Sequence, residues 1–313
     1  MSDGTERGGG LEMAAAMAIS GTIGYFVIES GQSIWNVVFF RCLFGAVCLT
    51  AYCGWRGLLF PWRFTMGSFL LCLVGGVAIV LNWVLLFSAY DLVSISIATT
   101  VYNMQPFFLI LLGVVLFGER PTADALAFIA VAFAGLLLVV KIDPAGFSLT
   151  GGYLAGIGLA LGAAALYAVA SIVTKRLKGI PPHLIALVQV ALGTAMLAPL
   201  ADFSALPAHG LQWGYLVTVG VVHTSLMYIL LYSALQKLPT TRVAVLSFVY
   251  PAVAILVDYV AYGRDLSPAQ WGGIALILLG SAGVNLKWRL GLTRPLDRAT
   301  RGDRASPQPS EAA

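Results

Sequence analysis

Ten long stretches of this chain are almost continuously apolar, and short polar segments separate them. Each stretch is close to the ~20 residues that an α-helix needs to cross a bilayer. None shows the alternation typical of a β-barrel strand. The pattern therefore predicts an all-α polytopic membrane protein with ten transmembrane helices. The expected spans are residues 11–29, 33–54, 66–90, 93–117, 122–141, 149–173, 183–202, 211–235, 240–262 and 268–289.

Composition and the distribution of charge support this prediction. Hydrophobic residues make up 59% of the chain and charged residues only 10%, whereas soluble domains carry about 25% charged residues. If the N-terminus is cytoplasmic, ten spans place 15 Lys and Arg residues inside and 2 outside, with Arg41 left within a span. Because cytoplasmic loops carry the excess of Lys and Arg, we expect both termini on the cytoplasmic side of the inner (plasma) membrane.

The second half of the chain repeats the first at an offset of 145 residues, and residues 87–140 align with 232–285 without a gap. The matching positions include Pro106 and Pro251, Gly118 and Gly263, and Gly135 and Gly280. Repeats of this kind are typical of transporters built from two related halves. Since each half has five spans, we expect two inverted five-helix repeats.

The repeat also predicts how the chain is divided. We expect the first repeat at residues 11–141 and the second at residues 149–289. Residues 1–10 include three consecutive glycines and are expected to form a mobile tail. Residues 293–313 are polar, basic and rich in proline, so a disordered cytoplasmic tail is expected there.

Two prolines interrupt equivalent spans of the halves. Pro106 and Pro251 each lack a backbone donor, which leaves the carbonyl four residues earlier, in Tyr102 and Ser247, without its helical partner. Within a bilayer such a carbonyl is tolerated only against protein or beside a water-filled cavity. We interpret the two prolines as hinges beside a shared central cavity; kinks that serve packing alone are the alternative.

Local motifs resemble a known family. A proline-broken fourth span, then Phe-Gly-Glu-Arg-Pro-Thr at residues 117–122, resembles the first half of an EamA-type transporter of the drug/metabolite transporter superfamily. The arginine within Phe-Phe-Arg-Cys-Leu-Phe-Gly at residues 39–45 also resembles that pattern. The resemblance implies ten helices, alternating access and a central cavity. It also implies export of an amino acid or an amino-acid-derived compound, such as a metallophore.

Polar and aromatic residues within the spans are the candidate substrate contacts, since a polar group at membrane depth needs a reason to be there. Arg41 aligns with Gln189 of the other half, and we expect it either to attract an anionic group of the substrate or to pair with Glu29. The full candidate set is Arg41, Asn82, Trp83, Tyr102, Asn103, Gln105, Tyr167, Tyr228 and Tyr250.

Three titratable residues are candidates for proton coupling: Glu29, His223 and Asp258. His223 and Asp258 align with Ala78 and Gly113 of the first half, so only one half carries each group. Histidine titrates near neutral pH, which suits a proton carrier. The alternatives are an interfacial Glu29, a buried neutral His223 and an Asp258 near the outer end of its span.

Other classes of function receive less support. A membrane enzyme such as a lipid or prenyl transferase would need clustered carboxylates or histidines, and the chain has no Asp-rich motif, His-Glu-x-x-His or phosphate-binding loop. We expect no enzyme activity, no cofactor, no metal site and no nucleic-acid partner. The prediction is a secondary transporter of a small organic solute, a monomer or homodimer in membrane lipid, with protons as the expected coupling ion. An importer of a vitamin-like or sugar-like solute is the alternative.

Overall fold

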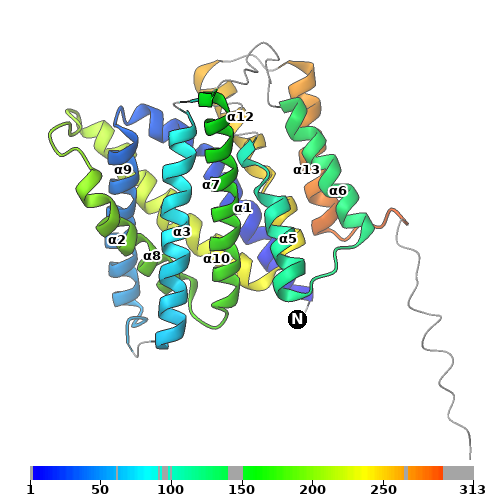
Figure 1. The fold of residues 1–313 in the computed structure, drawn as a ribbon, viewed down its shortest axis with the longest axis horizontal. Helices are drawn as coiled ribbons and strands as arrows, with labels where there is room; N and C mark the ends of the chain where they lie inside the picture. The colour runs from blue at the N-terminus through cyan, green and yellow to red at the C-terminus, as the bar shows by residue number, and fades with distance from the viewer. Residues whose placement is uncertain are drawn as a thin grey trace, which may run out of the picture.

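The computed structural model describes residues 3–60, 63–90, 92–93, 98, 101–139, 151–263 and 267–291. Its regular elements are all helical in this part of the chain (Figure 1). They are α1 (Asp3–Glu29), α2 (Ile34–Trp55), α3 (Met66–Tyr90), α5 (Gln105–Phe117), α6 (Ala123–Val139), α7 (Gly151–Arg176), α8 (Pro182–Leu197), the 3₁₀ turn η2 (Ala198–Leu200), α9 (Gly210–Gly220), the π-helical turn η3 (Val221–Leu226), α10 (Met227–Lys237), α11 (Thr240–Leu246), α12 (Val249–Tyr262) and α13 (Pro268–Asn285).

Seven helical segments of the described chain are long and apolar enough to cross a membrane. Three shorter apolar helices lie at Gln105–Phe117, Ala123–Leu138 and Pro268–Val284, within the fourth, fifth and tenth expected spans. The all-α membrane architecture is thereby confirmed, and the count of ten spans stays a prediction. The basic tail expected at residues 293–313 lies outside the described residues.

The start of the first helix differs from the prediction. Helix α1 begins at Asp3, so residues 3–10 belong to the helix and do not form a separate tail. Glu6 forms an ion pair with Arg242 at 3.1 Å. A Cβ on Gly9 would lie 3.0 Å from the Cβ of Lys237, so glycine permits close packing against α10. These tertiary contacts outweigh the low helix propensity of three glycines.

Both proline-containing spans break where the sequence predicts. A turn at residues 103–104 precedes α5, and a turn at residues 247–248 separates α11 from α12. The Ser247 carbonyl is not left unpaired as expected, because the backbone N–H of Tyr250 donates to it at 3.2 Å. This bond has the i to i+3 spacing of a 3₁₀ turn. It satisfies the Ser247 carbonyl, to which Pro251 has no N–H to donate.

The eighth expected span contains a feature that hydropathy does not predict. Helices α9 and α10 are joined by the π-helical turn η3. Two side chains of this turn satisfy backbone carbonyls five residues earlier: the Thr224 hydroxyl donates to Val219 O at 2.9 Å, and the Ser225 hydroxyl to Gly220 O at 3.1 Å. Such turns are frequent at functional sites.

The last helices of the two halves lie side by side at one edge of the bundle (Figure 1). A Cβ on Gly135 of α6 would lie 2.6 Å from the Gly273 carbonyl, and one on Gly280 of α13 would lie 2.7 Å from the Phe128 carbonyl. Both glycines therefore let the two backbones touch, which is how small residues hold helices together in lipid. This explains why the repeat places a glycine at both positions.

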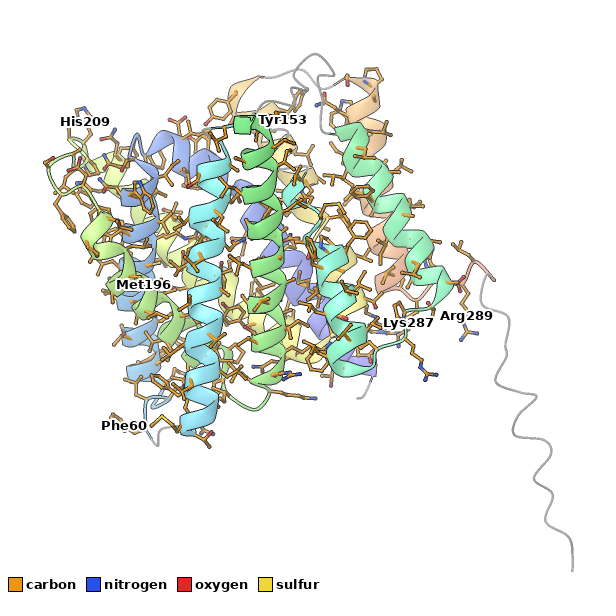
Figure 2. All side chains as sticks on the ribbon, in the orientation of Figure 1. Phe60, Tyr153, Met196, His209, Lys287 and Arg289 are labelled. Atoms are coloured by element: carbon orange, nitrogen blue, oxygen red, sulfur yellow. The ribbon has the colours of Figure 1, made fainter. Side chains whose placement is uncertain are left out.

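The two ends of the bundle carry different residues. One end holds the start of α1 (Figure 1), together with Phe60, Lys287 and Arg289 (Figure 2). We call it the N-terminal face. The opposite end holds His209 and Tyr153 (Figure 2), and α1 ends there at Glu29.

Candidate transport site

Arg41 is buried in the interior of the bundle, with 4% of its surface exposed. Its guanidinium carbon lies 4.1 Å from the centre of the Trp83 ring, and its Nε donates to the Thr224 hydroxyl at 3.3 Å. The Trp83 ring meets Tyr228 edge to face at 6.1 Å. A buried cation is costly in a membrane, and the ring and hydroxyl offset only part of that cost. Arg41 has no carboxylate partner among the described residues.

A second group of candidates surrounds Asn82, the residue that precedes Trp83 on α3. The Asn82 amide donates to the Ala163 carbonyl at 2.7 Å and to the Tyr102 hydroxyl at 3.3 Å. The Tyr102 and Tyr167 rings lie edge to face at 6.3 Å. Because Asn82 and Trp83 are consecutive, α3 joins this group to the Arg41 group. We call the two groups together the central cluster: Arg41, Asn82, Trp83, Tyr102, Tyr167, Thr224 and Tyr228.

Within the described part of the core, some buried amide oxygens have no hydrogen-bond donor. They belong to Asn82, which is fully buried, and Gln105, which is 4% exposed. Buried polar atoms are seldom left unsatisfied, because each costs free energy. A solute with N–H or O–H donors would satisfy them.

The remaining sequence candidates lie around the two helix breaks. Asn103 is buried in the first break, beside Gln105 and the buried Pro106. Tyr250 is half-buried in the first turn of α12, packs against the main core and is followed by the buried Pro251.

Tyr232 and Gln189 extend the cluster, and sequence reasoning missed them as contacts. The Tyr232 ring lies 5.2 Å from Tyr228, and its hydroxyl donates to the Gln189 side-chain oxygen. The Gln189 amide in turn donates to the Cys72 carbonyl at 3.4 Å. Gln189 aligns with Arg41 in the repeat, and this alignment is the feature of the sequence that could have identified it as a site residue.

His223 is 1% exposed and lies in the π-helical turn. Its Nε2 lies 2.8 Å from the Thr22 hydroxyl, which also donates to the Ile19 carbonyl, and its Nδ1 lies 3.4 Å from the Thr218 carbonyl. The carbonyl can only accept, whereas the hydroxyl can either accept or donate. The pair of oxygens therefore suits both the neutral and the doubly protonated ring.

Glu29 lies apart from the central cluster, at the opposite face. Its carboxylate accepts a hydrogen bond from the Tyr262 hydroxyl at 3.1 Å. The Tyr25 ring lies 6.1 Å from both Tyr262 and Tyr215, and the Phe26 ring lies 4.9 Å from His223. Aromatic rings thus connect Glu29 with His223. Asp258 belongs to α12, and its side chain lies outside the described part of the structure.

Ion pairs between the two halves hold the N-terminal face together. Glu119 of the first half accepts from Lys175 and from the Thr240 hydroxyl, and from the Thr240 backbone N–H at 2.9 Å. Glu12 pairs with Lys237. Burial acts to raise the pKa of the Glu119 carboxyl, but the bonds from Lys175 and Thr240 together outweigh it and lower that pKa. Glu119 therefore has a structural role at the edge of the bundle, where it ties the two halves together.

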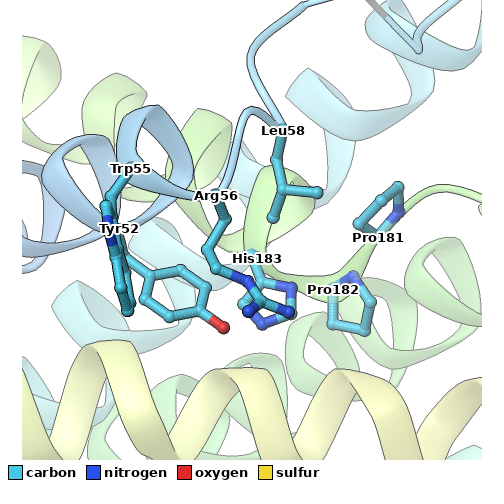
Figure 3. Close-up of a pocket in the computed structure, with 7 residues that line it drawn as sticks. All are labelled: Tyr52, Trp55, Arg56, Leu58, Pro181, Pro182 and His183. Carbon is cyan, nitrogen blue, oxygen red and sulfur yellow. The ribbon is translucent and has the colours of Figure 1, made fainter.

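Two pockets lie at the N-terminal face, away from the central cluster. One, of about 450 Å³, lies between the end of α2 and the start of α8, where Arg56 lies against His183 with Tyr52 and Trp55 to one side (Figure 3). The other, of about 500 Å³, lies between the α5–α6 loop, α11 and the end of α13. Neither is lined by a central-cluster residue. The cluster remains the candidate site because it combines a buried cation, Arg41, with an unsatisfied buried acceptor, the amide oxygen of Asn82.

The sequence profile of the EamA-like transporter family matches residues 10–141 and again residues 154–286. The chain belongs to this family. An uncharacterized transporter of Bacillus subtilis (strain 168), YxxF, is 31% identical over 278 residues, which cover 87% of this chain and 88% of that protein. An uncharacterized transporter of Archaeoglobus fulgidus is 28% identical over 284 residues, covering 90% and 97%. A crystal structure of another protein, 22% identical, has a TM-score of 0.77 over 89% of this chain and 96% of that chain, which supports the fold.

Membership confirms the resemblance to the EamA-type drug/metabolite transporters that the sequence motifs suggested. This EamA-family protein is a multi-pass membrane transporter, with a small-molecule substrate and a lipid environment. The double match also supports an architecture of two related repeats.

Proposed function

We propose that this EamA-family protein exports an amino acid or an amino-acid-derived compound across the inner membrane by alternating access. In this proposal ten spans form two oppositely inserted halves, residues 11–141 and 149–289, and both termini are cytoplasmic. The N-terminal face is then the cytoplasmic face, and the contacts of Glu119 and Glu12 close it.

The observation that carries the proposal is the pairing of a buried cation with buried acceptors. Arg41 offers positive charge to a carboxylate of the solute, while the free amide oxygen of Asn82 in the same cluster accepts from the solute's ammonium group. The free amide oxygen of Gln105, at the first helix break, is a second acceptor. The rings of Tyr102 and Tyr167 supply electron-rich faces beside that cation. A site that offers a cation to a carboxylate and an acceptor to an ammonium group favours a zwitterion over a purely anionic or purely cationic solute.

Proton coupling is part of the same proposal, with His223 as the carrier. Thr224, the next residue of the π-helical turn, contacts Arg41. Protonation of His223 makes both ring nitrogens donors, so the Thr22 hydroxyl then accepts from Nε2 and can donate only to the Ile19 carbonyl. A change in the conformation of the π-helical turn at His223 can therefore be transmitted to Arg41 through Thr224. Glu29 and Asp258 are the proposed partners in proton exchange.

Reconstituted vesicles test both parts. Vesicles loaded with single amino acids should release a subset of them, and Arg41→Gln should abolish release, while Arg56→Gln in the separate pocket of Figure 3 should leave it unchanged. Release should be accompanied by a pH change that His223→Ala or Asp258→Asn uncouples. No release of any amino acid, or an active Arg41→Gln, would refute the substrate class. Intact coupling in both other variants would refute the proton scheme.

A further inference from the structure

The second pocket at the N-terminal face joins parts of both halves. It has a volume of about 500 Å³ and lies between the α5–α6 loop of the first half and helices α11 and α13 of the second. Its lining includes four basic residues, Arg120, Arg242, Lys287 and Arg289. No step of the proposed transport cycle uses this pocket.

The charge of the pocket is positive on balance. Its lining carries two carboxylates, Glu119 and Asp124, against the four basic residues. Glu119 is engaged by Lys175 from outside the pocket. Glu6 of α1 lies 3.1 Å from Arg242 and 3.2 Å from Lys287, and so neutralises part of their charge. Arg120 and Arg289 lie at the exposed rim, and neither has a carboxylate partner in the described part of the chain.

The end of α13 is strained in a way that shapes this pocket. Lys287 has φ 56°, and among the described residues it is the one non-glycine with a positive φ. The Trp288 N–H donates to the Gly283 carbonyl at 2.8 Å and the Lys287 N–H to the Val284 carbonyl at 3.2 Å. These two bonds form a Schellman motif, in which glycine is the usual residue at the left-handed position. A lysine there is unfavourable, and it places Lys287 and Trp288 on the pocket wall.

Exposed apolar side chains lie on the two helices, α6 and α13, that contribute to the pocket. Leu126 of α6 and Leu279 of α13 are each about half exposed, and Trp288 is 46% exposed. Figure 2 shows Lys287 and Arg289 at the end of the bundle, next to these two helices. A basic pocket above an apolar helix pair matches a lipid, whose phosphate and acyl chains need both surfaces. Free phosphate would contact only the basic pocket.

We propose that this pocket binds the headgroup of an anionic phospholipid, with Arg120, Lys287 and Arg289 contacting the phosphate and the acyl chains lying along α6 and α13. The bound lipid bridges the two halves at the face that Glu119 and Glu6 hold together. Because the two halves must separate at this face for it to open, a bound anionic lipid that bridges them affects the opening of the transporter.

Binding can be measured on delipidated protein in neutral detergent. Three probes are titrated separately: a short-chain phosphatidylglycerol, the matching phosphatidylcholine and inorganic phosphate. Each basic residue near a headgroup contributes about a fivefold gain in affinity, so the double variant Arg120→Gln/Arg289→Gln should bind phosphatidylglycerol roughly 25-fold more weakly. Arg56→Gln, at the other pocket of the same face, should bind it like the wild type.

Lys287→Gly separates binding from folding. Glycine accepts the positive φ without strain, so this variant should unfold at the same or a higher temperature and still bind phosphatidylglycerol more weakly. Preference for phosphatidylglycerol over both other probes, lost in the pocket variants only, supports the site. Equal binding of phosphatidylcholine or of free phosphate would overturn it, as would an equal loss in Arg56→Gln or full binding by Lys287→Gly.

Discussion

Replacing Glu119 by glutamine should loosen the contact between the two halves at the N-terminal face. The Glu119 carboxylate is 19% exposed and receives donors from Lys175 and from both the N–H and the hydroxyl of Thr240. The carboxamide keeps one acceptor oxygen but turns the other into an N–H₂ group, which then faces a donor. The variant also leaves the Lys175 ammonium, 17% exposed, without its counter-charge.

The size of the effect follows from these contacts. Hydrogen bonds to charged groups each contribute about 1.5–3 kcal/mol. Since glutamine keeps part of the set, we expect a loss of about 2–3 kcal/mol in the free energy of unfolding at neutral pH. Thermal unfolding of the purified protein in mild detergent measures this loss. Paired with Lys175→Met in a double-mutant cycle, the change should show a coupling energy of about 1 kcal/mol or more.

The pH dependence gives a separate check on the same contact. Because its bonds lower the pKa of the Glu119 carboxyl in the folded protein, the stabilisation is complete above the unfolded value, about 4.3. It is lost as the pH falls through the lowered folded pKa. The wild type and Glu119→Gln should therefore differ by a constant amount between neutral pH and mild acid, and converge only below about pH 4. Equal stability at neutral pH, or a difference that grows in acid, would refute this reasoning.

Three further substitutions test the packing and capping described above. Gly280→Ala should destabilise by about 1–3 kcal/mol, because its Cβ would lie 2.7 Å from a carbonyl of α6; Gly272→Ala on the same helix meets nothing within 4 Å and serves as the control in thermal unfolding. Thr224→Val removes the hydroxyl that Arg41 uses and should lower stability by about 1–3 kcal/mol; an unchanged unfolding temperature would contradict the role of that bond. Ser267→Ala removes the capping box of α13 and should cost about 1 kcal/mol, seen as a matching fall in the unfolding temperature.

Local features of the fold were predictable because they depend on a few neighbouring residues. Gly118 and Gly263, which occupy matching positions of the repeat, both end their helices with φ near 60°, a conformation that glycine adopts readily. Ser267 caps α13, and Pro268 occupies its first turn. The long apolar stretches likewise marked the helices, since the bilayer requirement acts on each span separately.

The site was predictable in its residue types more than in its contacts. Buried polar residues within the spans drew attention to Arg41 and Asn82, and both are buried in the interior. The partner of Arg41 was not predictable, because Thr224 lies 183 residues away and reaches it only through helix packing. The pairing of Glu29 with Tyr262 depends on tertiary structure in the same way. The π-helical turn was not predictable, because Val-Val-His-Thr-Ser-Leu is an ordinary sequence for a helix.

That turn also changes how the two halves correspond. At the repeat offset of 145, the equivalent residues of the first half are 76–81, and they lie within the regular helix α3. Residues 221–226 of the second half form the π-helical turn instead. His223 lies in this turn and aligns with Ala78. The equivalence of the two halves is therefore lost, in backbone and in side chain, at the place where the titratable group lies.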